Sequence, residues 1–361
     1  MLSHDPTRPD RPIHPWVAAA AAGPRFGVGL GPQTLPDCID FVQLAEELGF
    51  DSYWANDHPT RTADPWNVLT ALAATTKRIR LGSLVSCVYY RNPVVLARQA
   101  ADVDRLSQGR LVLGIGIGDD AREFEQLGVR FPSPAERHEA LGESIEIVTR
   151  LWGDSPVSYR GKHFQIDNAQ LAGPGPVQRP HIPILIGGGG ERRTLEQVAR
   201  YADASNFGEH EWVGGATQSD DVTRKFDALR SHCDALGRPF SSILRSHVAI
   251  FLVLAETQSA LERKVGELAR SSDISRYGAA SPAGGARSAI DPPPQLSEDL
   301  RASLIACTPR DLVKRYRSLM ALGMQYFIAL VYGNDLETIR LLSREVIPEL
   351  KRPGDQSVAI R

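Results

Sequence analysis

From Arg25 onwards, short apolar runs alternate with longer segments in which apolar residues recur with a helical period. The short runs are rich in Val, Ile and Gly and apolar throughout, which is typical of parallel strands covered on both faces. Predicted strands occupy 25–30, 51–57, 78–86, 111–118, 182–190, 202–208, 245–255 and 326–332. Predicted helices occupy 34–49, 65–76, 93–107, 135–152, 191–201, 219–236, 309–323 and 335–350.

Eight successive strand–helix units favour an α/β fold, a closed (β/α)8 TIM barrel formed by a single domain over residues 25–351. An open, doubly wound parallel sheet is the alternative, because the same alternation of strands and helices also builds that fold. In a barrel, function gathers at the carboxyl ends of the strands. The residues that end each predicted strand are therefore the first candidates for a site.

Four segments fall outside the repeat. Residues 156–171 alternate polar and apolar positions around "RGK", which predicts a β-hairpin insertion. Residues 273–300 are rich in Gly, Ser, Ala and Pro and predict a flexible loop insertion. Residues 1–24 contain closely spaced prolines and no periodic pattern, so we expect a disordered N-terminal tail, and residues 352–361 form a C-terminal tail.

Composition excludes several partner classes. Hydrophobic residues make up 42% of the chain and charged residues 23%, as in ordinary globular proteins, and the formal net charge is −2. Lys and Arg are scattered, so we expect no nucleic-acid or membrane surface. The four cysteines are widely spaced without a metal-ligand pattern, which predicts reduced thiols, no metal site and a cytoplasmic location. Small molecules remain the expected partners.

Ionisable residues follow the second predicted strand. Asp57 and His58 stand directly after the apolar run "SYWA". An imidazole can give or take a proton near neutral pH, so His58 is a candidate acid or base. Asp57, or Asp119 after the fourth strand, could orient it or balance its charge. The alternatives are a surface histidine and an aspartate that caps the following loop.

Glycines mark two further strand ends. The fifth strand ends in Gly187, Gly188, Gly189 and Gly190 and runs straight into a helix, an arrangement in which backbone N–H groups can hold a phosphate. Arg192 or Arg193 could supply the countercharge. A tight turn alone would need only one or two glycines.

The fourth strand ends in Gly116, Ile117 and Gly118, where small residues would let a flat ligand approach the backbone. The spacing lacks the Gly-x-Gly-x-x-Gly pattern of dinucleotide-binding proteins, so we do not predict a dinucleotide site.

The ordered series of motifs resembles the bacterial luciferase-like superfamily of flavin- and deazaflavin-dependent oxidoreductases, particularly its F420-dependent branch. The resemblance rests on "DHP", "RIRLGSLVSCVYYRNPVVLARQAADVDRLSQGRLVLGIGIG", "RHEALGESIEIVTRLW", "VSYRGKHFQI", "PILIGGGGERRTLEQVARYADASN" and "TPRDLVKRY". It spans most of residues 25–351. Members are (β/α)8 barrels that hold FMN or F420 across the strand ends, and relatives often pair as homodimers through barrel helices.

The resemblance implies roles for individual residues. The glycine loop with Arg192 corresponds to the phosphate cradle. Ser83 and Leu84 correspond to a strand-three bulge that is often a non-prolyl cis peptide, and Asp57 and His58 to a pair that contacts the ring, with His58 as proton donor or acceptor. The remaining rim positions implied to lie near the cofactor are Ser86, Gly116, Ile117, Gly118, Gly187 and Asn206.

One position departs from the pattern. Some relatives use a glutamate after strand four, and many close relatives have Gly-Trp-Asn there; this chain has Gly118, Asp119 and Asp120. Asp119 would stand in for the glutamate with a shorter reach.

These observations favour an F420-dependent oxidoreductase that transfers a hydride between the deazaflavin and a small organic substrate. The ring of F420 has carbon where flavin has its reactive nitrogen, which disfavours oxygen activation. Two alternatives stay open: an FMN-dependent monooxygenase, and a non-catalytic barrel that binds a flavin.

Overall fold

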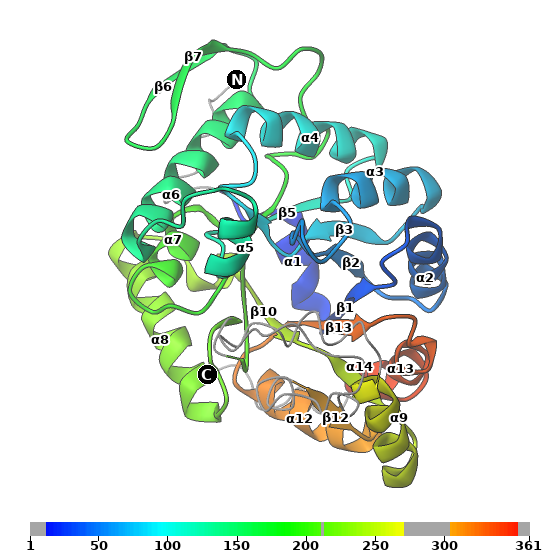
Figure 1. Cartoon of the computed structure of the whole chain (residues 1–361). Helices are drawn as coiled ribbons and strands as arrows, with labels where there is room; N and C mark the ends of the chain where they lie inside the picture. The colour runs from blue at the N-terminus through cyan, green and yellow to red at the C-terminus, as the bar shows by residue number, and fades with distance from the viewer. Residues whose placement is uncertain (1–11, 211–212, 271–303, 353–361) are drawn as a thin grey trace.

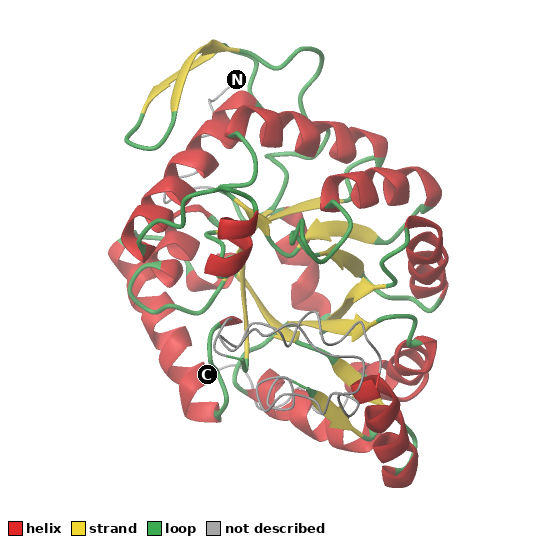
Figure 2. Ribbon diagram, viewed as in Figure 1, coloured by secondary structure: helices red, strands yellow, loops and turns green. Residues whose placement is uncertain are grey.

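The computed structural model describes residues 12–210, 213–270 and 304–352, and its centre is a closed ring of parallel strands surrounded by helices (Figures 1 and 2). The ring is made of β1 (Arg25–Gly31), β2 (Ser52–Ala55), β3 (Arg80–Ser83), β4 (Ser86–Cys87), β5 (Leu111–Gly116), β8 (Ile184–Gly187), β9 (Ala204–Gly208), β10 (Leu244–Ala249) and β13 (Tyr326–Tyr332). β1 pairs with β13, and β3 pairs with β5, so the sheet closes on itself. The predicted (β/α)8 barrel is confirmed, and the open sheet is excluded.

The helices lie outside this ring, close to their predicted positions. They are α2 (Leu35–Glu47), α3 (Pro65–Thr75), α4 (Pro93–Leu106), α6 (Pro134–Leu151), α7 (Thr194–Tyr201), α8 (Ser219–Ala235), α12 (Pro309–Ala321), α13 (Leu336–Leu341), a π-helical segment (Leu342–Val346) and α14 (Ile347–Lys351). Several begin at a side chain that accepts from a backbone N–H of the first turn, with proline at the first or second helical position: Thr34, Asp64, Asn92, Ser133 and Thr308. These caps replace hydrogen bonds that the first turn of a helix lacks.

Two apolar layers hold the barrel together. The larger lies between strands and helices and includes Phe41, Leu72 and Ile145. The smaller fills the barrel interior and includes Trp54, Val112 and Ile328. Trp54 is fully buried and occupies the space beside Gly82, where a Cβ atom would come within 2.4 Å of its ring. The interior is therefore packed with side chains rather than open, and a site must lie at an end of the barrel.

The N-terminal segment differs from its prediction. Residues 12–24 are not a disordered tail, because they contain α1 (Pro15–Ala19), whose Trp16 and Val17 are buried. The Trp16 ring packs edge-on against Tyr326 at the start of β13, with 6.0 Å between centroids. In Figure 1, α1 lies within the outline of the strand ring. This helix covers the N-terminal end of the barrel. Trp16 and Val17 supply its buried apolar surface, which the composition of the proline-rich segment did not indicate.

Two insertions project from the barrel. The predicted hairpin is present as β6 (Val157–Arg160) and β7 (Gln165–Ala169), which pair antiparallel. The predicted strand 245–255 is instead two strands, because the chain turns at Phe251, where φ is +50°, after β10 ends. Its second half, β11 (Leu252–Leu254), pairs with β12 (Ile305–Cys307) outside the barrel. The predicted loop 273–300 lies outside the described residues, and so does the predicted tail 352–361 except for Arg352.

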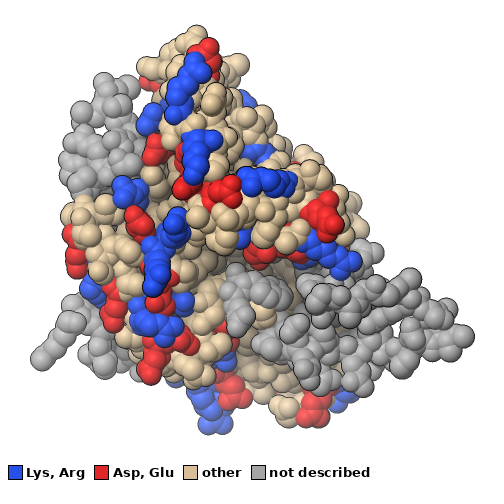
Figure 3. Space-filling model, turned by 60° about the vertical axis from the view of Figure 1, so that its left-hand side comes forward, with Lys and Arg blue, Asp and Glu red and all other residues tan. Residues whose placement is uncertain are grey.

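Charges are mixed over the face shown in Figure 3, where Lys and Arg alternate with Asp and Glu instead of gathering in one area. None of the helices in the described part of the chain is long and apolar enough to cross a membrane.

Candidate active site

The loop after β2 and the short helix α5 (Ala121–Gln126) carry the chemistry-bearing side chains of the barrel's C-terminal end. Asp120 caps α5, its Oδ1 accepting from the N–H groups of Arg122 and Glu123 at 2.9 and 3.2 Å. Its other carboxylate oxygen pairs with Arg61 of the β2 loop. Phe124, fully buried, anchors α5 against Tyr89, Tyr90 and Phe131. The helix is thus fixed against the loop on which His58 lies.

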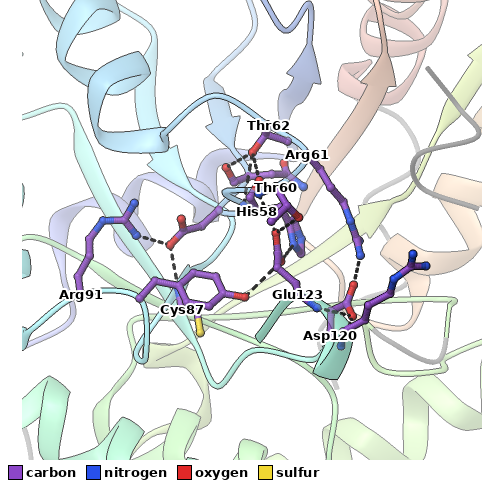
Figure 4. Close-up of polar contacts among 12 residues, drawn as sticks. His58, Thr60, Arg61, Thr62, Cys87, Arg91, Asp120 and Glu123 are labelled. Carbon is purple, nitrogen blue, oxygen red and sulfur yellow. Dashed lines mark hydrogen bonds and ion pairs between the residues drawn. The ribbon is translucent and has the colours of Figure 1, made fainter. Parts of the chain in front are cut away.

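His58 contacts a carboxylate on this helix (Figure 4). Its Nδ1 lies 2.7 Å from Oε2 of Glu123, whose side chain is fully buried, while the His58 side chain is 26% exposed. The opposite ring nitrogen, Nε2, has no partner among the described residues. His58 therefore combines one nitrogen held by a buried acid with one that faces outward.

Both carboxylate oxygens of Glu123 accept hydrogen bonds from several donors. Its Oε1 accepts from the backbone N–H and the hydroxyl of Thr60 at 3.1 and 2.9 Å, and its Oε2 also accepts from the Tyr90 hydroxyl at 3.2 Å. Burial alone would raise the pKa of this carboxyl, but the hydrogen bond and charge of His58 and the Thr60 donors lower it to about 2. Glu123 is therefore ionised at neutral pH, and His58 must carry its proton on Nδ1 to donate to it.

The predicted partners of His58 were wrong. Asp119 is exposed and makes no hydrogen bond within the described residues, and Asp57 faces away towards Arg91. Glu123 was missed because it stands four residues beyond Asp119, in a segment too short to show a helical period. Asp120 followed three residues later by Glu123 is a helix-start signal that could have located α5.

Asp57 is a buried carboxylate with one engaged oxygen. Its Oδ2 accepts from the Cys87 N–H at 3.0 Å and from Arg91 at 2.6 Å, and Arg91 also binds Asp64, the cap of α3. Burial raises the pKa of Asp57, opposed by the charge of Arg91. Its Oδ1 is buried without a hydrogen-bond partner, as are Oδ1 of Asn56 and Oγ of Ser86.

A cis peptide follows strand three, one residue beyond the Ser83–Leu84 step at which the resemblance implied it. The Leu84–Val85 peptide is cis and separates β3 from β4. The Val85 side chain lies over Gly116 and Gly187, where added Cβ atoms would come within 2.5 and 3.1 Å of it. Val85 occupies the space on the Cβ side of both glycines, and the predicted approach of a ligand to Gly116 stays a prediction.

Gly118 likewise accommodates the chain itself. Its φ is +72°, and a Cβ there would come within 2.8 Å of Phe124. Ile117 beside it is half-buried against the outer core. Phe124 therefore occupies the space on the Cβ side of Gly118, and the predicted approach of a flat ligand to this backbone stays a prediction.

The glycine loop between β8 and α7 contains backbone N–H groups that have no acceptor among the described residues. The N–H of Gly188 donates to the Asn206 carbonyl at 2.8 Å, whereas the N–H groups of Gly189 and Gly190 donate to no acceptor in the described part of the chain. Lys225, a buried residue of α8, donates to the Gly189 carbonyl at 2.8 Å. Lys225 also was missed, although a lysine on the apolar face of a predicted helix is a usable signal. The loop therefore combines free backbone donors with a buried positive charge.

The remaining predicted site residues differ in whether their side chains already have hydrogen-bond or ion-pair partners among the described residues. The Ser83 hydroxyl donates to the Gly114 carbonyl at 2.7 Å, and the Asn206 amide donates to Ser246 at 2.9 Å, both inside the barrel wall. Arg192 is exposed beside the glycine loop and makes no ion pair with another described residue.

These features fit a phosphate-bearing cofactor with a polar ring. Unpaired buried polar atoms are costly unless a ligand supplies the missing partners. Asp57, Asn56 and Ser86 offer such atoms at one part of the rim, and Gly189 and Gly190 offer unpaired N–H groups at the helix start on another.

Comparison with known proteins identifies the chain's family. The sequence model of the luciferase-like monooxygenase family matches residues 9–324. The chain belongs to this family. The predicted membership of the luciferase-like superfamily is thereby confirmed.

Relatives of this luciferase-like protein include F420-dependent enzymes. It is 33% identical over 182 residues, 48% of the chain, to an F420-dependent glucose-6-phosphate dehydrogenase of Amycolatopsis mediterranei, of which the match spans about half (52%). It is 28% identical over 330 residues to the 5,10-methylenetetrahydromethanopterin reductase of Archaeoglobus fulgidus, covering 86% of the chain and 95% of the relative. The solved structure of monooxygenase RslO1 from Streptomyces bottropensis shares its fold, with a TM-score of 0.71, 23% identity, and coverage of 90% and 99% of the two chains.

Proposed function

We propose that this chain is an F420-dependent oxidoreductase that transfers a hydride between the deazaflavin and a small organic substrate. The observation that carries the proposal is the His58–Glu123 pair, which presents one unpartnered ring nitrogen at the carboxyl ends of the barrel strands. The similarity to the F420-dependent glucose-6-phosphate dehydrogenase of Amycolatopsis mediterranei supports the choice of cofactor.

The residues that would hold the cofactor follow from their unpaired groups. Gly189, Gly190 and Arg192 would bind the phosphate, while Asp57 Oδ1 would accept a hydrogen bond from a donor on the ring. When bound, F420 supplies or accepts a hydride at a ring carbon.

His58 handles the proton that balances this hydride. Glu123 holds Nδ1 protonated, so Nε2 is the atom that can accept a proton from a substrate hydroxyl or return one to a carbonyl oxygen. The buried negative charge of Glu123 stabilises the imidazolium that forms when Nε2 gains its proton. Tyr90, whose pKa is raised mainly by burial, stays protonated and keeps donating to Glu123 throughout.

Titration of the purified protein with F420 and, separately, with FMN tests the proposal. We expect binding of F420 at least about tenfold tighter than FMN, measured by isothermal titration calorimetry. Tight FMN binding with negligible F420 binding would favour the flavin-dependent monooxygenase, which the similarity to RslO1 keeps as the second candidate. Binding of neither would favour a non-catalytic barrel.

Replacement of Arg192 by Gln tests the phosphate cradle. The arginine is exposed and has no protein ion pair to lose, so the fold should be unaffected. We expect the Kd for F420 to rise about tenfold, since a charge-assisted hydrogen bond is worth roughly 1.5–3 kcal/mol. Arg98→Gln, on the outer surface of α4, is the matched control and should leave Kd unchanged. Equal affinities in both variants would contradict the role of Arg192.

A further inference from the structure

The barrel has a cavity at the end opposite the proposed active site. Its volume is about 380 Å³, within the usual range of small-molecule pockets. It lies where strands begin: β1 starts at Arg25, β3 at Arg80 and β13 at Tyr326. The lining is completed by α1, the end of α2 and the segments before β2 and β3: Trp16, Ala19, Glu46, Gly49, Phe50, Asp51 and Arg78.

Both carboxylates that line this cavity are already engaged. Asp51 pairs with Arg25 at 2.7 Å and accepts from the Phe26 N–H at 2.8 Å. Glu46 accepts from the backbone N–H groups of residues 77, 78 and 79 at 2.9, 2.6 and 2.8 Å. These acids hold the walls of the cavity in place, and their charge is directed at other partners.

Arg80 lines the same cavity without a carboxylate of its own. Its guanidinium makes one long hydrogen bond, to Gln178 Oε1 at 3.4 Å, and no ion pair with another described residue. It is only partly exposed, and burial lowers its pKa, an effect that the nearby charges of Asp104 and Asp51 offset only in part. Four of its five N–H donors are therefore unused. Arg78, exposed at the rim, makes one side-chain hydrogen bond, to the Glu46 carbonyl at 3.4 Å.

We propose that this cavity is a second ligand site, which binds a small organic anion through a phosphate or carboxylate group held by Arg80 and Arg78. The planar guanidinium matches both kinds of oxyanion in a two-point hydrogen bond. The carbon skeleton of the ligand would lie against Trp16 and Tyr326, at the junction between α1 and the barrel. This site is independent of the proposed redox reaction, and its ligand would stabilise the closed N-terminal end of the barrel.

Binding of inorganic phosphate and of citrate to the full chain, each at constant ionic strength, tests the proposal. We expect at least one to bind with a Kd in the millimolar range or below by calorimetry. Its binding to the folded protein should raise Tm progressively with the logarithm of its concentration above Kd. Arg80→Gln should weaken that binding at least about tenfold. Arg98→Gln, an arginine already paired with Asp102 on α4, is the matched control and should bind normally.

A second variant separates this site from the glycine loop, which could also hold phosphate. Arg192→Gln should still bind the anion normally, and Arg80→Gln should bind it more weakly. If instead Arg192→Gln lost anion binding and Arg80→Gln kept it, the anion would bind at the other end of the barrel, and the proposal would be overturned. Absence of binding by both probes would overturn it too. If Arg80 served only the fold, Arg80→Gln would lower Tm without anion, and anion would raise Tm equally in both proteins.

Discussion

Replacing His58 with alanine is expected to lower turnover about a hundredfold or more while leaving the affinity for F420 within a few-fold of the unaltered protein. Its Nε2 is the unpartnered nitrogen of a ring whose Nδ1 is 2.7 Å from Glu123, so the variant loses the atom that would move the substrate's proton. The cofactor-holding groups, Asp57 and the glycine loop, make no contact through this side chain. Steady-state turnover and calorimetric affinity, measured on the same preparations, separate the two effects.

The control is His163→Ala, which removes an imidazole from the loop of the β6–β7 hairpin, away from the barrel strands. We expect it to turn over normally. Unchanged turnover in His58→Ala would remove His58 from the mechanism, and a parallel loss of F420 binding would make it a cofactor ligand instead.

The sequence predicted the features of the site that depend on strand ends. The strands β2, β5 and β8 are largely apolar runs followed by polar or glycine residues. The positions of Asp57, His58 and the glycine loop at one rim therefore followed from the order of elements. The structure has a non-prolyl cis peptide between Leu84 and Val85, one residue after the Ser83–Leu84 step at which the resemblance implied it.

The contacts between loops could not be predicted in the same way. Glu123 reaches His58 across 65 residues of sequence, from a six-residue helix whose position is set by the packing of Phe124 and the ion pair between Arg61 and Asp120. Hydrophobic periodicity does not predict such tertiary contacts, and a helix of about one and a half turns is too short to show a repeat. Sequence reasoning therefore chose Asp119, the first acid after the fourth predicted strand, over the acid that is nearest to His58 in space.

The N-terminal helix shows the same limit for the fold. Residues 15–19 are too few to form a stable helix alone, and α1 exists because Trp16 and Val17 are buried at the barrel end. The composition of residues 12–24 correctly indicated that this segment cannot form a core by itself. It did not indicate that the segment packs against the end of the barrel and completes the barrel's core.

Replacing Glu123 with glutamine is expected to cost about 3 kcal/mol of unfolding free energy near neutral pH. The carboxyl has a pKa of about 2 in the folded protein, against 4.5 ordinarily, and each unit is worth about 1.4 kcal/mol. Because the folded pKa is the lower one, this stability is present above about pH 4.5 and is lost as pH falls towards about 2. Urea unfolding should give a difference between the two proteins of about 3 kcal/mol at about pH 7 and about 2 kcal/mol at about pH 3.5.

The same variant should also slow turnover, since a neutral amide no longer stabilises the charged imidazole or fixes which nitrogen of His58 carries the proton. Glu125→Gln, an exposed position on the same helix, is the matched control and should change neither stability nor rate appreciably. A stability difference between Glu123→Gln and the unaltered protein that stays constant down to about pH 3 would show that the charge of Glu123 contributes nothing. The loss would then come from packing, and the ionised acid that keeps the proton of His58 on Nδ1 would have no thermodynamic support.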